Sequence, residues 1–128
     1  MPRAAALLAV ASAAFLAACG KPAEIVEKSY FAGNDYWVVI VNRSALKNPA
    51  ELTPIARRLC QEKEACLVGM WFDAKKAPNF LPVNAEQRRE QIYIYGWREA
   101  TKAEIANWNC EVFPNRPAND CMTVSLNR

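Results

Sequence analysis

The chain contains no histidine among its 128 residues. This absence excludes the serine, cysteine and metal mechanisms that rely on an imidazole, the commonest acid or base near neutral pH. A Cys-x-x-Cys pair, typical of thiol oxidoreductases, is also missing. Only four glycines are present, and none builds a phosphate-binding loop. We therefore expect a non-enzymatic protein with no catalytic residue, no cofactor and no bound metal.

The sequence also has little net charge. Its 16 basic and 13 acidic side chains leave a formal net charge of +3. Proteins that bind nucleic acids usually carry a strongly basic patch or stripe. We expect no nucleic-acid partner.

The most hydrophobic run lies near the N-terminus and is too short to cross a membrane. Residues 4–18 are apolar apart from Ser12, and they follow a single basic residue, Arg3. A spanning helix needs about 20 apolar residues. One basic residue followed by a short apolar run is instead typical of a secretory leader. The pattern predicts a signal peptide over residues 1–18.

This run ends in Leu16-Ala17-Ala18-Cys19. The motif resembles the lipobox of bacterial lipoproteins, whose cysteine is alkylated with diacylglycerol and becomes the new N-terminus after cleavage. The resemblance implies lipidation of Cys19 and a mature protein that carries two or three acyl chains, such as palmitate. Several chains anchor a protein firmly. The residue after the cysteine is Gly20, and in this respect the chain resembles lipoproteins that are sent to the outer membrane. The resemblance implies an envelope location facing the periplasm.

The cysteine count agrees with export. Five cysteines are present, so lipidation of Cys19 leaves an even number, suited to two disulfides in an oxidising compartment. Four cysteines allow three pairings. We expect Cys60 to pair with Cys66 and Cys110 with Cys121, because each bond closes a short local loop.

Hydrophobic periodicity predicts a βαβ unit in the first half of the domain. Residues 36–41 and 65–72 are nearly continuous apolar runs, as in buried strands. Thr53, followed by proline, predicts the N-cap of a helix over 53–60 between them. Residues 25–31 fit either an earlier strand or a short helix.

The second half predicts two further short helices and a last strand. A capping box at Asn84 predicts a helix over 84–95, although residues 92–95 have strong strand propensity. A second capping box predicts a helix over 101–108. Apolar and polar residues alternate over 122–126, which predicts a half-buried strand.

The chain therefore divides into a leader over 1–18, a lipid-anchored tether over 19–24 and one globular domain over 25–128. We expect an α/β fold, with α+β as the alternative. The cysteine and tryptophan spacing is also similar to small exported bacterial proteins to which no activity is assigned. That similarity is carried by Leu59-Cys60, Cys66, Val68, Trp71, Leu81-Pro82 and Trp108-Asn109-Cys110.

Aromatic residues offer a candidate binding face. Trp37 and Trp71 lie in the two apolar runs, where core packing is the simpler interpretation. Tryptophan, tyrosine and arginine carry much of the binding energy at interfaces. We therefore take as candidate partner-binding residues Tyr93, Tyr95, Trp97 and Arg98.

Three classes of function stay open. The first is a membrane-anchored binding or scaffolding module whose partner is an envelope protein or a glycan. The second is an inhibitor or exclusion factor that acts through the loop over 111–120. The third is a small hydrolase that uses two carboxylates. The candidate carboxylates are Asp35, Glu51, Asp73, Glu86, Glu90, Glu104 and Asp120.

Overall fold

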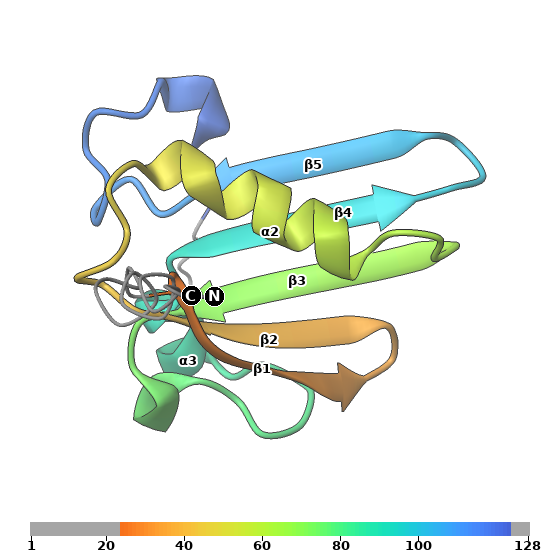
Figure 1. Cartoon of the computed structure of the whole chain (residues 1–128), viewed down its shortest axis with the longest axis horizontal. Helices are drawn as coiled ribbons and strands as arrows, with labels where there is room; N and C mark the ends of the chain where they lie inside the picture. The colour runs from red at the N-terminus through yellow and green to blue at the C-terminus, as the bar shows by residue number, and fades with distance from the viewer. Residues whose placement is uncertain (1–23, 124–128) are drawn as a thin grey trace, which may run out of the picture.

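A five-stranded mixed β-sheet with the spatial order β1-β2-β3-β4-β5 forms the centre of the domain (Figure 1). The computed structural model describes residues 24–123, so the predicted leader, Cys19 and the tether before Glu24 lie outside the described residues. The strands are β1 Val26–Gly33, β2 Tyr36–Val41, β3 Ala65–Trp71, β4 Tyr93–Arg98 and β5 Ala103–Trp108. The helices are α2 Leu52–Leu59 and α3 Ala85–Glu90, and the 3₁₀ turns are η1 Pro49–Glu51, η2 Ala74–Lys76 and η3 Ala118–Asp120. The fold is thus a small mixed α/β domain in which strands dominate.

The first two strands form an antiparallel hairpin, so residues 25–31 belong to a strand and not to a helix. The connecting turn holds Asn34 and Asp35 at φ values of 50° and 61°. Short polar side chains tolerate this left-handed region, which tight hairpin turns require. Every residue of β2 except the half-buried Trp37 is buried, as expected for an interior strand.

The β2–α2–β3 segment forms the predicted βαβ unit, because β2 and β3 pair in parallel. Helix α2 begins earlier than the sequence predicts. Asn48 caps η1 and forms a capping box with Glu51, so the chain is already helical at Leu52. Thr53 therefore lies within the helix, where its hydroxyl oxygen is 2.9 Å from that of Tyr93.

The predicted helix over 84–95 is wrong in its second half. Asn84 and Gln87 do form the expected capping box, but α3 ends at Glu90 and β4 starts at Tyr93. Strand β4 pairs antiparallel with both β3 and β5. Pairing on both sides satisfies the backbone groups of a stretch whose aromatic and β-branched side chains already favour a strand.

The predicted helix over 101–108 is also wrong, because this segment contains strand β5. A tight turn precedes the strand and holds Lys102 at a positive φ of 54°. The carboxylate of Glu104 does not cap a helix. It accepts hydrogen bonds from Arg57 and Tyr95 instead.

The two faces of the sheet are covered by different segments. On one face, α2 buries Leu52 and Ala56 against residues of β3 and β4, and Figure 1 shows the helix lying across β3, β4 and β5. On the other face, the connection between β3 and β4 covers the fully buried Trp71. The expectation that tryptophans on these strands pack in the core holds fully for Trp71 and partly for Trp37.

Both expected disulfides are present. Cys60–Cys66 joins the end of α2 to the start of β3, and Cys110–Cys121 closes the loop that follows β5. Cys121 also forms an isolated parallel bridge with Trp108. In the predicted strand over 122–126, the first two residues are not in a strand, and residues 124–128 lie outside the described residues.

Candidate functional site

Two of the four predicted partner-binding residues are buried beneath helix α2. Tyr93 and Tyr95 are 0% and 2% exposed, respectively. Trp97 follows on the same face of β4 and is half-buried, whereas Arg98 is exposed on the other face. Because successive strand residues point to opposite faces, these four side chains do not form one surface. Tyr93 and Tyr95 thus have almost no exposed surface through which to contact a partner directly.

The tyrosine hydroxyl groups instead help to fix the helix on the sheet. Arg57 Nε and Nη2 each donate a hydrogen bond of 2.8 Å to the carboxylate of Glu104. Tyr95 donates a third, of 2.6 Å. The hydrogen bonds from Arg57 and then from Tyr95 lower the pKa of Glu104 to about 2. A carboxylate held ionised in this way is poorly suited to proton transfer near neutral pH, so its position indicates a structural role.

The other carboxylates considered for a hydrolase are spread over several elements, and only Glu86 and Glu90 share one, helix α3. Two of them cap 3₁₀ turns, because Glu51 accepts from the Asn48 amide and Asp73 from the Lys75 amide. Two others form ion pairs with Lys76 and Arg116. The full set is Asp35, Glu51, Asp73, Glu86, Glu90 and Asp120. Their placement lends no support to the hydrolase hypothesis.

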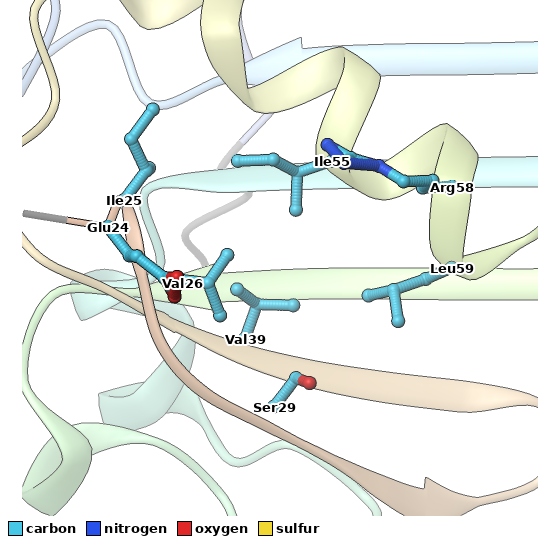
Figure 2. A pocket seen from close by; sticks show the side chains of 8 residues that line it. All are labelled: Glu24, Ile25, Val26, Ser29, Val39, Ile55, Arg58 and Leu59. Atoms are coloured by element: carbon cyan, nitrogen blue, oxygen red, sulfur yellow. The ribbon is translucent and has the colours of Figure 1, made fainter. Parts of the chain in front are cut away.

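A groove of about 540 Å³ lies between β1 and the outer side of α2 (Figure 2). The fully buried Val39 of β2 lies beneath it, and Val26 and Ser29 of β1 lie alongside. Ile55 and Leu59 of α2 form the opposite wall, and Figure 2 shows them facing the strand residues. The groove is therefore mostly apolar.

The groove exists because one helix covers only part of the sheet. Strands lie about 4.8 Å apart, so five strands span about 19 Å, whereas a helix with its side chains is about 10 Å wide. Helix α2 lies over β3, β4 and β5 (Figure 1). The groove lies on the side of α2 toward β1, over which the helix does not extend.

Two charged side chains line the groove. Arg58 extends from the helix side and Glu24 lies at the first described residue, next to Ile25 (Figure 2). Both charged side chains are exposed. Within residues 24–123, Arg58 forms no salt bridge. Arg58 thus places a positive charge, unpaired within the described residues, on the helix side of the groove. One end of the groove lies where the predicted tether enters the domain.

The apolar surface continues along the hairpin beyond the groove. Trp37 lies two residues from Val39 on the same face of β2, and Phe31 is its cross-strand partner. The two aromatic rings have centroids 5.4 Å apart. Phe31 is 54% exposed. Together, Phe31 and Trp37 extend the apolar surface toward the end of the hairpin.

The helical repeat of the sequence places Ile55, Ala56, Leu59 and Cys60 on one face of α2. In the structure, Ala56 and Cys60 are buried with Leu52, whereas Ile55 and Leu59 are half-buried beside the groove. The apolar stripe of α2 is therefore wider than packing against the sheet alone requires. This extra width is the sequence signal for the groove.

Comparison of the chain with protein-family models, with curated proteins and with solved structures finds no match. In the part of the chain that the structure covers, no helix is both long and apolar enough to span a bilayer. The same part contains no cluster of three or more acidic or cysteine side chains that could hold a metal ion.

Proposed function

We propose that this protein is a lipid-anchored binding module of the cell envelope, without catalysis, and that its groove holds one amphipathic helix of an envelope protein. The sequence Leu16-Ala17-Ala18-Cys19 supports the anchor. The two disulfides are consistent with an oxidising compartment such as the periplasm. An outer-membrane location follows from Gly20 through the resemblance to lipoproteins sorted there.

The observation that carries this proposal is the mostly apolar groove between α2 and β1. Two-layer domains bury a sheet face by packing helices side by side on it. Here a groove lined by Val26, Ile55 and Leu59 lies next to α2 in the described part of the chain. A partner helix with apolar residues at i, i+3, i+4 and i+7 would complete the layer.

The groove also favours a particular charge on that helix. Arg58 has no salt-bridge partner within the described chain, and it stands at the rim of the apolar surface. An acidic residue beside the apolar face of the partner helix would pair with it. Charge pairs at an interface rim mainly set orientation and association rate, while the apolar contacts supply affinity.

Site-specific photocrosslinking in native envelopes tests the proposal. A benzophenone amino acid at Ser29, beside the groove, should crosslink to a segment that mass spectrometry identifies as an amphipathic helix of one envelope protein. A probe at Ile105, on the other face of the sheet, is the positional control. The proposal fails if both probes give the same products, or if the Ser29 probe crosslinks only lipid.

A matched pair of substitutions sharpens this experiment. Leu59→Glu places a charge in the wall of the groove and should abolish the crosslink from Ser29. Phe80→Glu makes the same change at a side chain that is 75% exposed and does not line the groove. It should leave the crosslink unchanged, and circular dichroism should show that both variants fold.

The loop over 111–120 supports a second candidate function, that of an inhibitor or exclusion factor. The Cys110–Cys121 disulfide closes this loop, and Arg116 stacks on Trp108 with 3.8 Å between its guanidinium carbon and the ring centroid. Such a constrained loop suits insertion into another protein. Replacement of the exposed Pro114 and Asn115 by alanine separates the two candidate functions. If the variant no longer inhibits its partner but still gives the Ser29 crosslink, the function belongs to the loop.

A further inference from the structure

A polar pair is buried on the face of the sheet opposite the groove. Tyr36 of β2 is 6% exposed and Gln91, just before β4, is 2% exposed. Gln91 Nε2 donates to the Tyr36 hydroxyl oxygen at 3.3 Å. Burying polar groups is costly, so a pair kept in such a place needs an explanation.

Gly69 makes room for this pair. A Cβ atom at this position would lie 2.2 Å from the Tyr36 hydroxyl oxygen and 2.6 Å from Gln91 Nε2. Glycine in the middle of a strand is destabilising because it adds backbone entropy to the unfolded chain and has no side chain to pack. Its presence in the buried strand β3 is explained by the close approach of these two polar groups.

The pair lines a pocket of about 460 Å³. Apolar walls come from Leu81 and Val83 of the β3–β4 connection and from Ile94 of β4. Arg88 of α3 also lines the pocket. Pockets of this size, apolar with a few polar groups, are typical of small-molecule sites.

Arg88 and the Tyr36 hydroxyl supply hydrogen-bond donors to the pocket, and the side-chain amides of Asn34 and Gln91 also line it. The Tyr36 hydroxyl accepts from Gln91, and within residues 24–123 its own proton has no acceptor. Arg88 is exposed and forms no salt bridge in this part of the chain. The pocket lining includes no carboxylate. One guanidinium and one neutral hydroxyl match the charge and the acceptor atoms of a single carboxylate.

We propose that this pocket binds a small ligand consisting of a carboxylate attached to a branched apolar group. The carboxylate accepts hydrogen bonds from Arg88 and Tyr36, and the apolar group packs against Leu81, Val83 and Ile94. This site is separate from the helix-binding groove, which lies on the other face of the sheet. Either proposal can fail without the other.

The protonation state of Tyr36 agrees with its role as a donor. Burial raises the pKa of this hydroxyl to about 12, against smaller opposing effects of the Gln91 hydrogen bond and the Arg88 charge. The hydroxyl therefore keeps its proton throughout the neutral range.

The test is an NMR titration of the ¹⁵N-labelled domain with N-acetyl-L-leucine and, separately, with N-acetyl-L-leucinamide. The two probes share their apolar group and differ in the carboxylate. The acid should bind with a Kd of about 1 mM and shift the amide signals of Leu81, Val83 and Ile94, as expected for a small ligand. The amide should bind about tenfold more weakly, because it lacks the charge-assisted hydrogen bonds.

Two arginine variants provide a matched control. Arg88→Gln should weaken binding of the acid about tenfold and leave binding of the amide unchanged. Arg89→Gln removes the neighbouring exposed charge, which does not line the pocket, and should change neither. Tyr36→Phe should weaken the acid about fivefold. The proposal is overturned if the acid and the amide bind equally, if Arg88→Gln behaves like Arg89→Gln, or if the shifted signals map elsewhere.

Discussion

Arg57 of α2 and Glu104 of β5 are joined by two hydrogen bonds of 2.8 Å each, although 47 residues separate them in the sequence. Tyr95 donates to the same carboxylate from β4. This group ties the outer surface of the helix to two strands of the sheet. It holds α2 over β4 and β5, and the groove lies on the side of the helix toward β1.

The first prediction concerns the pH dependence of this group. The pKa of Glu104 falls from its ordinary value of 4.5 to about 2 in the folded protein. Its contribution to stability is therefore present above about pH 4.5 and is lost as the pH falls toward 2. Glu104→Gln should cost about 1 kcal/mol at pH 7, a small value because the pair is partly exposed to solvent.

Urea denaturation at pH 7 and pH 3 measures this effect. The wild-type protein should lose more stability between these two pH values than Glu104→Gln does. Glu86→Gln, a change at an exposed residue on α3, is the control and should follow the wild type. An equal loss in wild type and Glu104→Gln would show that the carboxylate does not contribute in this way.

The second prediction concerns Gly69. Gly69→Ala should lower the free energy of unfolding by about 2 kcal/mol, because the added methyl group collides with the Tyr36 hydroxyl in a packed interior. In a Tyr36→Phe background the cost should fall, because that hydroxyl is gone. Thermal unfolding of the four proteins of this double-mutant cycle gives the coupling energy directly.

Gly96→Ala is the matched control for this experiment. Gly96 lies in the adjacent strand β4, and the atoms nearest to a Cβ atom there belong to the side chains of Ile105 and Leu67, each at 3.2 Å. Those two side chains are exposed and can move. If Gly69→Ala lowers the free energy of unfolding no more than Gly96→Ala does, the close approach of Tyr36 and Gln91 to Gly69 is contradicted.

The third prediction concerns the disulfides. Removal of either bond by paired alanine substitutions should cost about 2 to 3 kcal/mol, because each constrains a short loop of the unfolded chain. Non-reducing digestion should recover the peptide pairs Cys60–Cys66 and Cys110–Cys121, and denaturant unfolding gives the energies. Recovery of four free thiols from the native envelope would exclude both bonds.

The fourth prediction concerns the anchor. Cys19→Ser should block lipidation and leave the leader attached. The retained leader increases the mass of the peptide chain, whereas the mass of the acyl chains is lost. Mass spectrometry and membrane fractionation check both effects, with Ser12→Ala as a control in the leader that should be processed normally. A wild-type protein found soluble with an unmodified Cys19 would refute the lipoprotein proposal.

The sequence predicts the βαβ unit well because its signals are local. The apolar runs that become β2 and β3 have no polar face, and a helix lies between them. The disulfide partners are also close in sequence, so short loops were sufficient to choose the pairing. These features need no knowledge of distant contacts.

The errors arise where distant contacts decide. The capping box at Asn84 is real, yet α3 has only six residues because the next segment pairs with β3 and β5. Strand β5 lies at the edge of the sheet and contains alanine, glutamate and asparagine, which are weak strand formers. Its conformation is set by pairing with β4, a non-local interaction that a capping pattern does not reveal.

The candidate site could be predicted only in part. Aromatic enrichment pointed to Tyr93 and Tyr95, but the register of β4 turns both toward α2. The groove depends on which half of the sheet the helix covers, and this follows from contacts such as Arg57 with Glu104. Gly69 was the available signal for the second pocket, since glycine within an apolar strand indicates a close approach.

Backbone pairing begins at the very start of the described chain, where the Asn42 amide donates to the Ile25 carbonyl at 2.7 Å. A mechanical pull on the N-terminal side of the domain therefore reaches the β1–β2 ladder before any other part of the sheet. The same few residues line the groove (Figure 2). A helix seated there would bear tension together with β1, so the load path from the proposed lipid anchor to a bound partner would bypass β3, β4 and β5.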